Sequence, residues 1–304
     1  MIYLISNCTN SKKITPLNNL ILKNYCFKDI NSSIENWNNN IKIPSINMTA
    51  AKELYKGHSW QEVLKGINIL SQKYTTELLV SSAGYGLIES NERINSYQAT
   101  FSKGNENSIH NFRSETMTPT ITWWNKINKF DTSVLKKDSY IFINVSYEYL
   151  IAMQSTITEL IETFGEKVFI IVLSQEKLPT IYDNYLLRFD TRFNTFEKGT
   201  ITSIIPRFSR WLFKEIVEKD LELTNQKLQN HIDTFLSNFA DYKIEKRIQC
   251  TNTQVIELIS DHIINENIKS ATQGLKKFRS LGYACEQKRY GQLFKQTMDG
   301  IKNG

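Results

Sequence analysis

Val168-Phe169-Ile170-Ile171-Val172-Leu173 is an unbroken run of apolar, mostly β-branched residues that ends at the polar Ser174. A continuous run of this kind, without the polar alternation of a half-exposed strand, is typical of a strand buried on both faces of a parallel sheet. Three shorter runs have the same character: Ile2-Tyr3-Leu4-Ile5, Leu78-Leu79-Val80 and Tyr140-Ile141-Phe142-Ile143. These four runs predict the core strands of one sheet.

Segments with helical periodicity lie between these strands. Residues 50–70 and 147–164 repeat apolar side chains at the spacing of an amphipathic helix. Strands that alternate with helices indicate a parallel sheet with crossover helices, so the predicted fold class is α/β. Residues 185–190 are a candidate edge strand, whereas residues 14–48 and 89–118 have weak periodicity and are expected to be an irregular insertion and a long loop.

The pattern becomes helical after Pro206, and a separate small unit follows Cys250. The helices expected in this unit cover residues 253–264, 270–280 and 286–298. Three short helices, with Gly282 in the turn before the third, favour an all-α, helix-turn-helix-like module. The predicted domains are an α/β domain at 1–205, a helical linker at 206–250 and a basic helical DNA-binding module at 251–304.

The composition is that of a globular chain. Hydrophobic residues make up 40% and aromatic residues 12% of 304 residues, which suits one α/β domain with a smaller second one. The net charge of +6 permits an anionic partner such as nucleic acid without requiring one. No signal peptide precedes the first strand, and no apolar run approaches the roughly 20 residues of a membrane helix, so a cytoplasmic location without membrane contact is expected.

Metal and cofactor chemistry has no clear signal. The four cysteines contain no CxxC pair, which disfavours a structural zinc site, and their low number disfavours a secreted disulfide scaffold. The four histidines, His58, His110, His231 and His262, form no metal-binding spacing. The loop after the first strand lacks the glycines of a P-loop. We therefore expect neither a metal nor a cofactor.

Small polar residues follow each predicted core strand. Ligands bind beyond the carboxyl ends of the strands in open parallel sheets, so these residues predict one polar pocket. Ordinary turn chemistry would place the same residue types there. The candidates for binding a base or nucleotide are Ser6, Thr9, Ser11, Ser81, Ser82, Tyr85, Asn144 and Ser146.

Basic side chains gather in the C-terminal unit, interleaved with Tyr283 and Tyr290. This arrangement favours contacts with phosphates that position a duplex without reading its sequence, although a solvated helical face is the alternative. Thr200, Ser203 and Arg207 fall at a predicted helix start, where an anion can bind. The candidates for contacting the DNA backbone are Lys12, Lys13, Arg207, Lys276, Lys277, Arg279, Lys288 and Arg289.

Three stretches resemble known proteins. They are Ile5-Ser6-Asn7-Cys8-Thr9-Asn10-Ser11-Lys12-Lys13, then Ala51-Lys52-Glu53-Leu54-Tyr55-Lys56-Gly57 with Val80-Ser81-Ser82-Ala83-Gly84-Tyr85-Gly86-Leu87-Ile88, and Gly282-Tyr283-Ala284-Cys285-Glu286-Gln287-Lys288-Arg289-Tyr290. The first two resemble a bacterial α/β family related to peroxide-stress proteins, with a Ser-Cys-Thr-x-Ser-Lys-Lys loop. All three together resemble a group of anti-phage DNA glycosylases that remove α-glucosylated hydroxymethylcytosine and have a core similar to uracil-DNA glycosylases.

The resemblance covers about half of the chain and departs from the family in two places. Asn7 stands inside the usual Ser-Cys-Thr run, and the Gly-Gln-Asp-Pro-Tyr-His loop of the main uracil glycosylases is absent from the sequence. The family's catalytic residues are therefore not carried over. What the resemblance implies is an enzyme that excises a modified cytosine from double-stranded phage DNA as a defence.

Hydrolysis of an N-glycosidic bond passes through an oxocarbenium-like transition state, so a carboxylate or amide must position water and stabilise positive charge. Asp190 is the preferred carboxylate, Glu53 the second choice and Glu148 the third. Asn7 is the candidate for orienting water, and Tyr85 for stacking on the flipped base.

Two other classes of function stay open. One is a sensor of nucleic acid or nucleotide without catalysis, and the other is an enzyme acting on free nucleosides. A basic helical tail favours a polymer over a free nucleoside, so a monofunctional DNA glycosylase is the main hypothesis.

Overall fold

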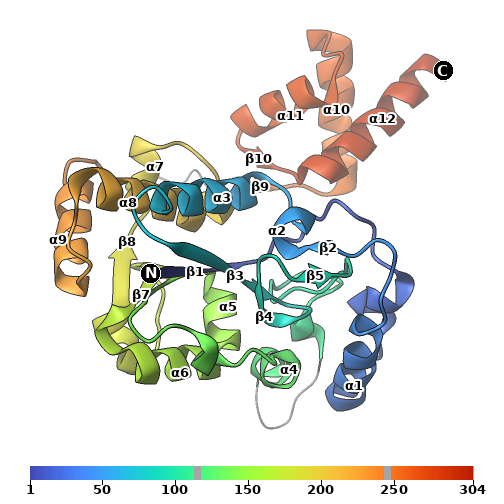
Figure 1. Ribbon diagram of the computed structural model, residues 1–304. Helices are drawn as coiled ribbons and strands as arrows, with labels where there is room; N and C mark the ends of the chain where they lie inside the picture. Colours follow the sequence, from blue (N-terminus) through green and yellow to red (C-terminus); the bar gives the residue numbers. More distant parts are fainter. Residues whose placement is uncertain (113–117, 243–247, 304) are drawn as a thin grey trace. The chain divides into compact units, whose positions relative to one another are not determined.

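The computed structural model describes residues 1–112, 118–242 and 248–303, apart from the side chains of Lys288, Lys302 and Asn303. The chain forms two compact units, Met1–Tyr242 and Lys243–Gly304 (Figure 1). The predicted linker at 206–250 is therefore wrong. Its two helices, α8 (Ile204–Lys219) and α9 (Asn225–Leu236), belong to the first unit, where α8 packs along α3 (His58–Leu70) and α9 packs beside the edge strand.

The first unit is built on a six-stranded sheet, which confirms the α/β fold class. Its spatial order is β4-β3-β1-β6-β7-β8. The strands are β1 (Ile2–Asn7), β3 (Thr76–Ser82), β4 (Gly86–Glu89), β6 (Tyr140–Asn144), β7 (Val168–Leu173) and β8 (Leu186–Phe189). All neighbours pair in parallel except β3 with β4. The four apolar runs and the edge strand lie where the sequence predicts them, while β4 was not predicted.

The parallel strands have the doubly wound order 2-1-3-4-5. From β1 the chain crosses to β3 on one side, and the later strands β6, β7 and β8 are laid down on the other side. The winding direction therefore reverses between β1 and β6, whose register pairs Ser6 with Asn144. In open α/β sheets the crevice at such a reversal, beyond the carboxyl ends of the strands, is where ligands bind.

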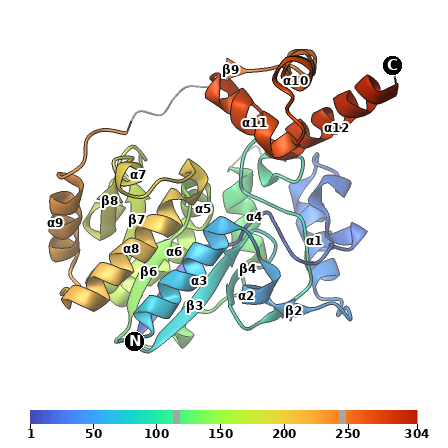
Figure 2. The same ribbon diagram turned by 90° about the horizontal axis from the view of Figure 1, so that it is seen from above.

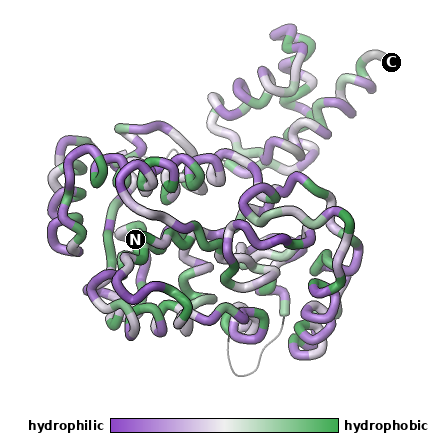
Figure 3. Tube along the Cα trace, in the orientation of Figure 1, coloured by the Kyte–Doolittle hydropathy of each residue, from purple (hydrophilic) through white to green (hydrophobic). Residues whose placement is uncertain are grey.

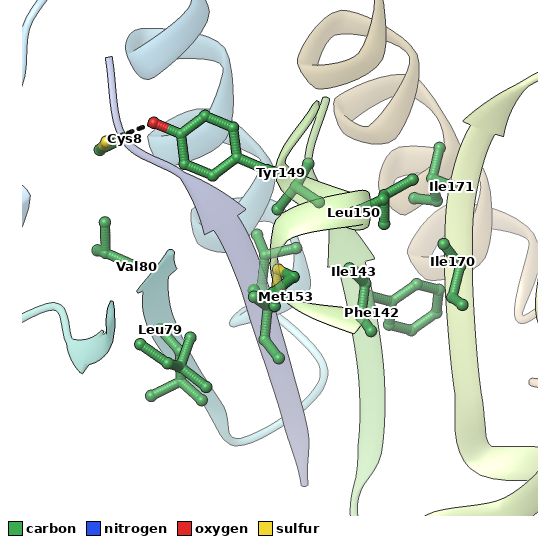
Figure 4. Close-up of a cluster of buried hydrophobic side chains, with 14 of the residues drawn as sticks. Cys8, Leu79, Val80, Phe142, Ile143, Tyr149, Leu150, Met153, Ile170 and Ile171 are labelled. Atoms are coloured by element: carbon green, nitrogen blue, oxygen red, sulfur yellow. Dashed lines mark hydrogen bonds between the residues drawn. The ribbon is translucent and has the colours of Figure 1, made fainter. Parts of the chain in front are cut away.

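Helices cover both faces of the sheet because its strands are apolar on both faces. Helices α3 and α8 lie on one face, and α4 (Pro119–Ile127), α5 (Tyr147–Ala152) and α6 (Gln154–Phe164) on the other (Figures 1 and 2). The strands at the centre are hydrophobic while the covering helices alternate in hydropathy (Figure 3). Figure 4 shows the side chains of Tyr149 and Leu150 of α5, and of Met153 directly after it, beside the strands.

The Asn-rich insertion contains an unpredicted helix, α1 (Ile30–Ile41). Asp29 caps it by accepting hydrogen bonds from the backbone N–H groups of Asn31 and Ser32. Its apolar face includes Trp37, whose indole N–H donates to the Gly84 carbonyl oxygen at 2.8 Å. The segment predicted to be an irregular insertion therefore contains a helix cap and a short apolar stripe.

Short elements complete the first unit. They are β2 (Thr49–Ala50), α2 (Ala51–Leu54), β5 (Arg93–Ile94), α7 (Phe193–Phe196) and the 3₁₀ turns Asn18–Leu20, Leu22–Asn24, Ile109–Asn111, Thr132–Val134, Gly165–Lys167, Thr180–Tyr185 and Ile201–Ser203. Strands β2 and β5 pair antiparallel. Residues 89–112 and 118 are largely loop, as predicted, and the remainder of the predicted loop lies outside the described residues.

The second unit is a small helical bundle. Its elements are β9 (Ile248–Gln249), α10 (Asn252–Glu266), α11 (Ala271–Ser280), β10 (Tyr283–Ala284) and α12 (Gln287–Asn303). Thr251 and Gln254 form a capping box on α10, and Ser270 caps α11. The three helices follow the prediction, but the unit is not all-α, because β9 and β10 pair in parallel.

Candidate functional site

A cavity of about 480 Å³ opens at the reversal point of the sheet. This volume lies in the range of small-molecule sites, about 300–1,000 Å³. Its lining comes from the ends of β1, β6 and β7, the first turns of α3, α5 and α8, and two loops: Ser6, Asn7, Thr9, Ser59, Val63, Ser102, Lys103, Asn144, Ser146, Tyr147, Glu148, Leu173, Glu176, Ile201, Thr202, Ile205 and Pro206. We call this space the switch-point cavity.

Asn144 stands at the end of β6 and is 2% exposed. Its amide nitrogen has no hydrogen-bond partner among the described residues. A buried unsatisfied donor costs about 1–3 kcal/mol, so native proteins retain one only where something compensates. Since Asn144 also lines the switch-point cavity, a ligand acceptor is the natural compensation.

Asn7 links the two strands that flank the reversal point. Its Oδ1 accepts a hydrogen bond from the Ser146 backbone N–H at 3.0 Å, and its Nδ2 donates to the Cys8 carbonyl oxygen at 2.9 Å. An amide NH₂ group carries two hydrogens, so Asn7 can still present one to a ligand. Its main effect is to hold the β1 and β6 ends together.

Glu148, the third-choice carboxylate, lies in the first turn of α5 and lines the switch-point cavity. Its Oε1 is 3.1 Å from Lys103 Nζ, and its Oε2 is 3.0 Å from His110 Nε2. Both partners, Lys103 and His110, come from the long loop that precedes α4, and neither was among the predicted site residues. The loop thus fixes the orientation of this carboxylate.

Glu176 is a second carboxyl group on the same cavity, and it was also not predicted. It lies three residues past the end of β7, on the turn that leaves the strand. Burial and, to a lesser extent, the negative charge of Glu148 raise the pKa of Glu176 above its ordinary value. Its position after a core strand was the signal that could have identified it.

Asp190 lies in a different cavity, of about 400 Å³, beside the edge strand β8. Its carboxylate accepts hydrogen bonds from Arg192, with Nη2 at 2.7 Å. Burial alone would raise the pKa of Asp190, but the hydrogen bonds and charge of Arg192 outweigh burial and lower it. The structure does not bring Asp190 and Asn7 together, so the prediction that they share a site is corrected. Glu53 is exposed on α2 and also lies outside the cavity.

The predicted binding residues divide into two groups. Ser6, Thr9, Asn144 and Ser146 line the switch-point cavity, whereas Ser11, Ser81, Ser82 and Tyr85 lie outside its lining. Ser11 is exposed, and the buried Ser81 hydroxyl contacts the Met153 sulfur at 3.5 Å. The Tyr85 hydroxyl is bonded to the backbone N–H and carbonyl of Asn95, and burial raises its pKa. Tyr85 is therefore corrected from a stacking platform in this cavity to a packing residue.

A buried network of hydroxyl groups lies behind the cavity. Tyr97 Oη is 3.2 Å from Cys8 Sγ and 2.7 Å from Ser82 Oγ, and Tyr55 Oη is 3.1 Å from Tyr97 Oη. Tyr149 Oη reaches the same sulfur at 3.1 Å, as Figure 4 shows. Burial raises the pKa of all three tyrosines, so they remain neutral donors at ordinary pH.

Lys12 turns toward this network instead of outward. Its Nζ lies 4.2 Å from the Tyr97 ring centroid and donates to the Thr9 carbonyl oxygen at 3.3 Å. Burial lowers the pKa of Lys12, with the nearby Cys8 acting in the opposite direction. The prediction that Lys12 grips a DNA phosphate is therefore corrected, whereas Lys13 is exposed.

Arg207 is also an internal residue, only 1% exposed. Its guanidinium donates to the Glu197 carbonyl oxygen, to Asn194 Oδ1 at 2.6 Å and to the Thr200 carbonyl oxygen at 3.1 Å. A Cβ atom at Gly199 would lie 2.4 Å from the guanidinium carbon, which explains the glycine there. Its predicted role as a surface phosphate contact is corrected, because the side chain ties the turn before α8 together.

The second unit has a groove of about 550 Å³ formed by α11 and α12. Lys276 is exposed on its wall, and Arg279 lines it while donating to the Cys285 carbonyl oxygen at 3.2 Å. The other predicted phosphate contacts are engaged within the unit: Lys277 pairs with Glu266 at 3.0 Å, and Arg289 donates to Asn252 Oδ1 at 2.8 Å. The side chain of Lys288 lies outside the described residues.

Among the described residues, one group of side chains of metal-ligating type comes together, which the spacing of the histidines along the sequence did not indicate. Ligand atoms of Asp261, His262 and Glu266 on α10 lie within 4.8 Å of one another. His262 is buried, and Glu266 also holds Lys277 in an ion pair. The group is remote in sequence from the switch-point cavity residues.

No protein-family model matches the chain, and no curated protein sequence matches it. Of the helices in the described part of the chain, none has the length and apolar character needed to cross a membrane.

Proposed function

We propose that the chain is a DNA glycosylase that hydrolyses the N-glycosidic bond of a modified cytosine, of the glucosylated hydroxymethyl type, in double-stranded phage DNA. The product is an abasic site. The observation that carries the proposal is the switch-point cavity, in which the Glu148 carboxylate and the unpartnered amide of Asn144 line one space of about 480 Å³. That volume suits a base that carries a hexose.

Glu148 replaces Asp190 as the carboxylate of the reaction. Lys103 and His110 hold its two oxygens, and each oxygen has a further lone pair that can accept a hydrogen bond from water. The negative charge offsets the positive charge that develops on the sugar, and the carboxylate takes a proton from the attacking water. Asn7 holds together the strand ends beside which this water is positioned.

The DNA substrate is flipped so that its nucleotide reaches the cavity. Lys276 and Arg279 of the groove in the second unit contact phosphates, which supplies affinity that does not depend on sequence. A free nucleoside would have no use for such a groove, so the groove supports a polymer substrate.

The test is release of free base, measured by mass spectrometry, from DNA carrying glucosylated hydroxymethylcytosine and from unmodified DNA. The wild-type protein is expected to release the modified base and leave alkali-labile sites. Glu148→Gln is expected to lower the single-turnover rate by about 10²–10⁴-fold, the usual value of a positioned acid or base. Glu53→Gln is the matched control, since Glu53 is an exposed glutamate outside the cavity.

The rival proposal is a sensor that binds a modified nucleotide without cleaving it. It is favoured by one observation, that both Glu148 oxygens already have a side-chain partner, Lys103 on one and His110 on the other. Tight binding of the modified DNA with no base release by the wild-type protein would support the sensor and reject the glycosylase. Equal release by wild type and Glu148→Gln would remove Glu148 from the mechanism.

A further inference from the structure

We infer that Glu176 is the acid of this site: its carboxyl group donates a hydrogen bond to the departing base and transfers its proton as the glycosidic bond breaks, while Asn144 holds the same acceptor edge. This inference rests on the proposed function and assigns the second carboxyl group of the cavity.

The first support is placement. Glu176 lines the same cavity as Glu148 and Asn144, and it follows β7, the neighbour of β6 in the sheet. Its backbone is fixed on both sides, because its N–H donates to the Leu173 carbonyl at 3.0 Å and its carbonyl accepts from Arg188 Nη1 at 3.3 Å. The side chain therefore leaves from a defined turn at the rim.

The second support is the difference between the two carboxyl groups. Among the described residues, Glu148 forms an ion pair with Lys103 and a hydrogen bond with His110, whereas Glu176 has no ion pair. Burial and the charge of Glu148 raise the pKa of Glu176. When their environments give two carboxyl groups different proton affinities, one can act as a base and the other as an acid.

The groups facing Glu176 across the cavity are few. Glu148 and Tyr147 come from α5, and Lys103 comes from the long loop. The Tyr147 hydroxyl donates to the Lys177 carbonyl at 3.2 Å, and Lys103 is paired with Glu148. The Arg188 guanidinium binds the carbonyl of Glu176 and forms an ion pair with Asp183 at 3.6 Å. Burial therefore biases Glu176 toward the protonated form, and the negative charge of Glu148 adds to this bias.

The third support is the acceptor that both groups require. The Asn144 amide needs an acceptor to satisfy its buried N–H, and a protonated carboxyl group needs one as well. The O2 carbonyl oxygen of cytosine, on the carbon beside the glycosidic nitrogen, and the N3 ring nitrogen beyond that carbon offer two acceptors on one edge. A base held this way leaves with its developing negative charge neutralised.

The step balances without a co-reactant. Water forms the new bond to C1′ and gives its proton to the Glu148 carboxylate. The C1′–N bond breaks, its electron pair goes to the base, and the base takes the proton of Glu176. Glu176 ends ionised and Glu148 protonated, and exchange with solvent restores both.

The experiment is the pH dependence of single-turnover base release from DNA carrying glucosylated hydroxymethylcytosine, with folding of each variant checked by circular dichroism. Wild type is expected to show a bell-shaped profile, with a basic limb set by loss of the Glu176 proton. Glu176→Gln should be at least 100-fold slower and lack that limb, and Glu176→Asp should restore part of the rate together with the limb. Glu162→Gln, an exposed glutamate on α6, is the control and should match wild type.

The two proposals fail in different ways. If wild type releases no base at any pH, the glycosylase and the acid assignment fall together. If wild type releases base and Glu148→Gln does not, while Glu176→Gln keeps the wild-type rate and the same basic limb, the glycosylase stands and the assignment of Glu176 is wrong.

Discussion

Replacing Asn144 by leucine should make the protein more stable and inactive. The amide nitrogen is buried without a partner in the described structure, so the folded state carries an unsatisfied donor worth about 1–3 kcal/mol. Leucine has the same number of side-chain heavy atoms as asparagine and needs no hydrogen-bond partner. We expect the free energy of unfolding to rise by about 1–2 kcal/mol, which raises Tm by roughly 2–8 °C for a unit of this size. Base release should fall by about 10²–10³-fold, the effect of losing one donor to a developing charge.

Urea unfolding followed by tryptophan fluorescence measures the first effect, and single-turnover base release measures the second. Asn7→Leu is the matched control, because it removes the hydrogen bonds to Ser146 and Cys8 and should lower stability by about 1–2 kcal/mol. If Asn144 only supported the fold, Asn144→Leu would lower the stability of the protein, as Asn7→Leu is expected to do. A less stable Asn144→Leu, or one that releases base like wild type, would refute the reasoning.

Three further predictions concern residues outside the cavity. Asp190→Asn should leave base release within about twofold of wild type, because Asp190 pairs with Arg192 in a separate cavity; a 100-fold loss would return it to the mechanism. Burial alone would raise the pKa of Glu62, but Lys65 and Arg210 lower it, so its stabilisation is present above its unfolded pKa and is lost as pH falls through the folded value. Glu62→Gln should therefore cost about 3 kcal/mol at pH 7 and flatten the stability profile below pH 5, as acid-unfolding curves would show. Lys276→Ala should reduce the salt dependence of DNA binding by about one unit of slope, whereas Arg207→Met should destabilise the fold by about 3 kcal/mol and leave that slope unchanged in binding titrations.

The core strands could be predicted because burial on both faces leaves a continuous apolar run. Val168–Leu173 and the run at 140–143 are such segments, and their polar ends predicted a pocket that the sheet does build. Strand β4 was missed because it is a short antiparallel edge strand that directly follows β3. Helix α1 was missed because asparagines dilute its apolar stripe, although its Asp29 cap was visible.

Asp190 was predicted to share a site with Asn7 because the alternation of strands and helices in a sequence does not give the spatial order of the strands. Asp190 follows β8 and Glu148 follows β6, and both positions look alike along the chain. The observed order places β6 beside β1 at the reversal point and β8 at the edge. Only the order of the strands therefore separates a residue of the main cavity from one of a peripheral cavity.

The direction of individual side chains was the other missing information. Lys12 and Arg207 read as cations next to a strand end and a helix start, but Lys12 packs over Tyr97 and Arg207 binds backbone carbonyls. Tyr97 lies 85 residues from Lys12 along the chain, and Asn194 lies 13 residues from Arg207. Folding brings each partner close. Residue type and local position predict charge, and they do not predict which way the charge faces.

The loop after β1 separates the two sides of the site. Asn7 and Thr9 line the switch-point cavity, while Cys8 between them is buried against the hydroxyl groups of Tyr97 and Tyr149. Because extended residues alternate in direction, anchoring Cys8 on one side fixes Asn7 and Thr9 on the other. A residue inserted or deleted before Cys8 would exchange these two sides, so the hydroxyl network acts as the element that sets the register of the cavity wall.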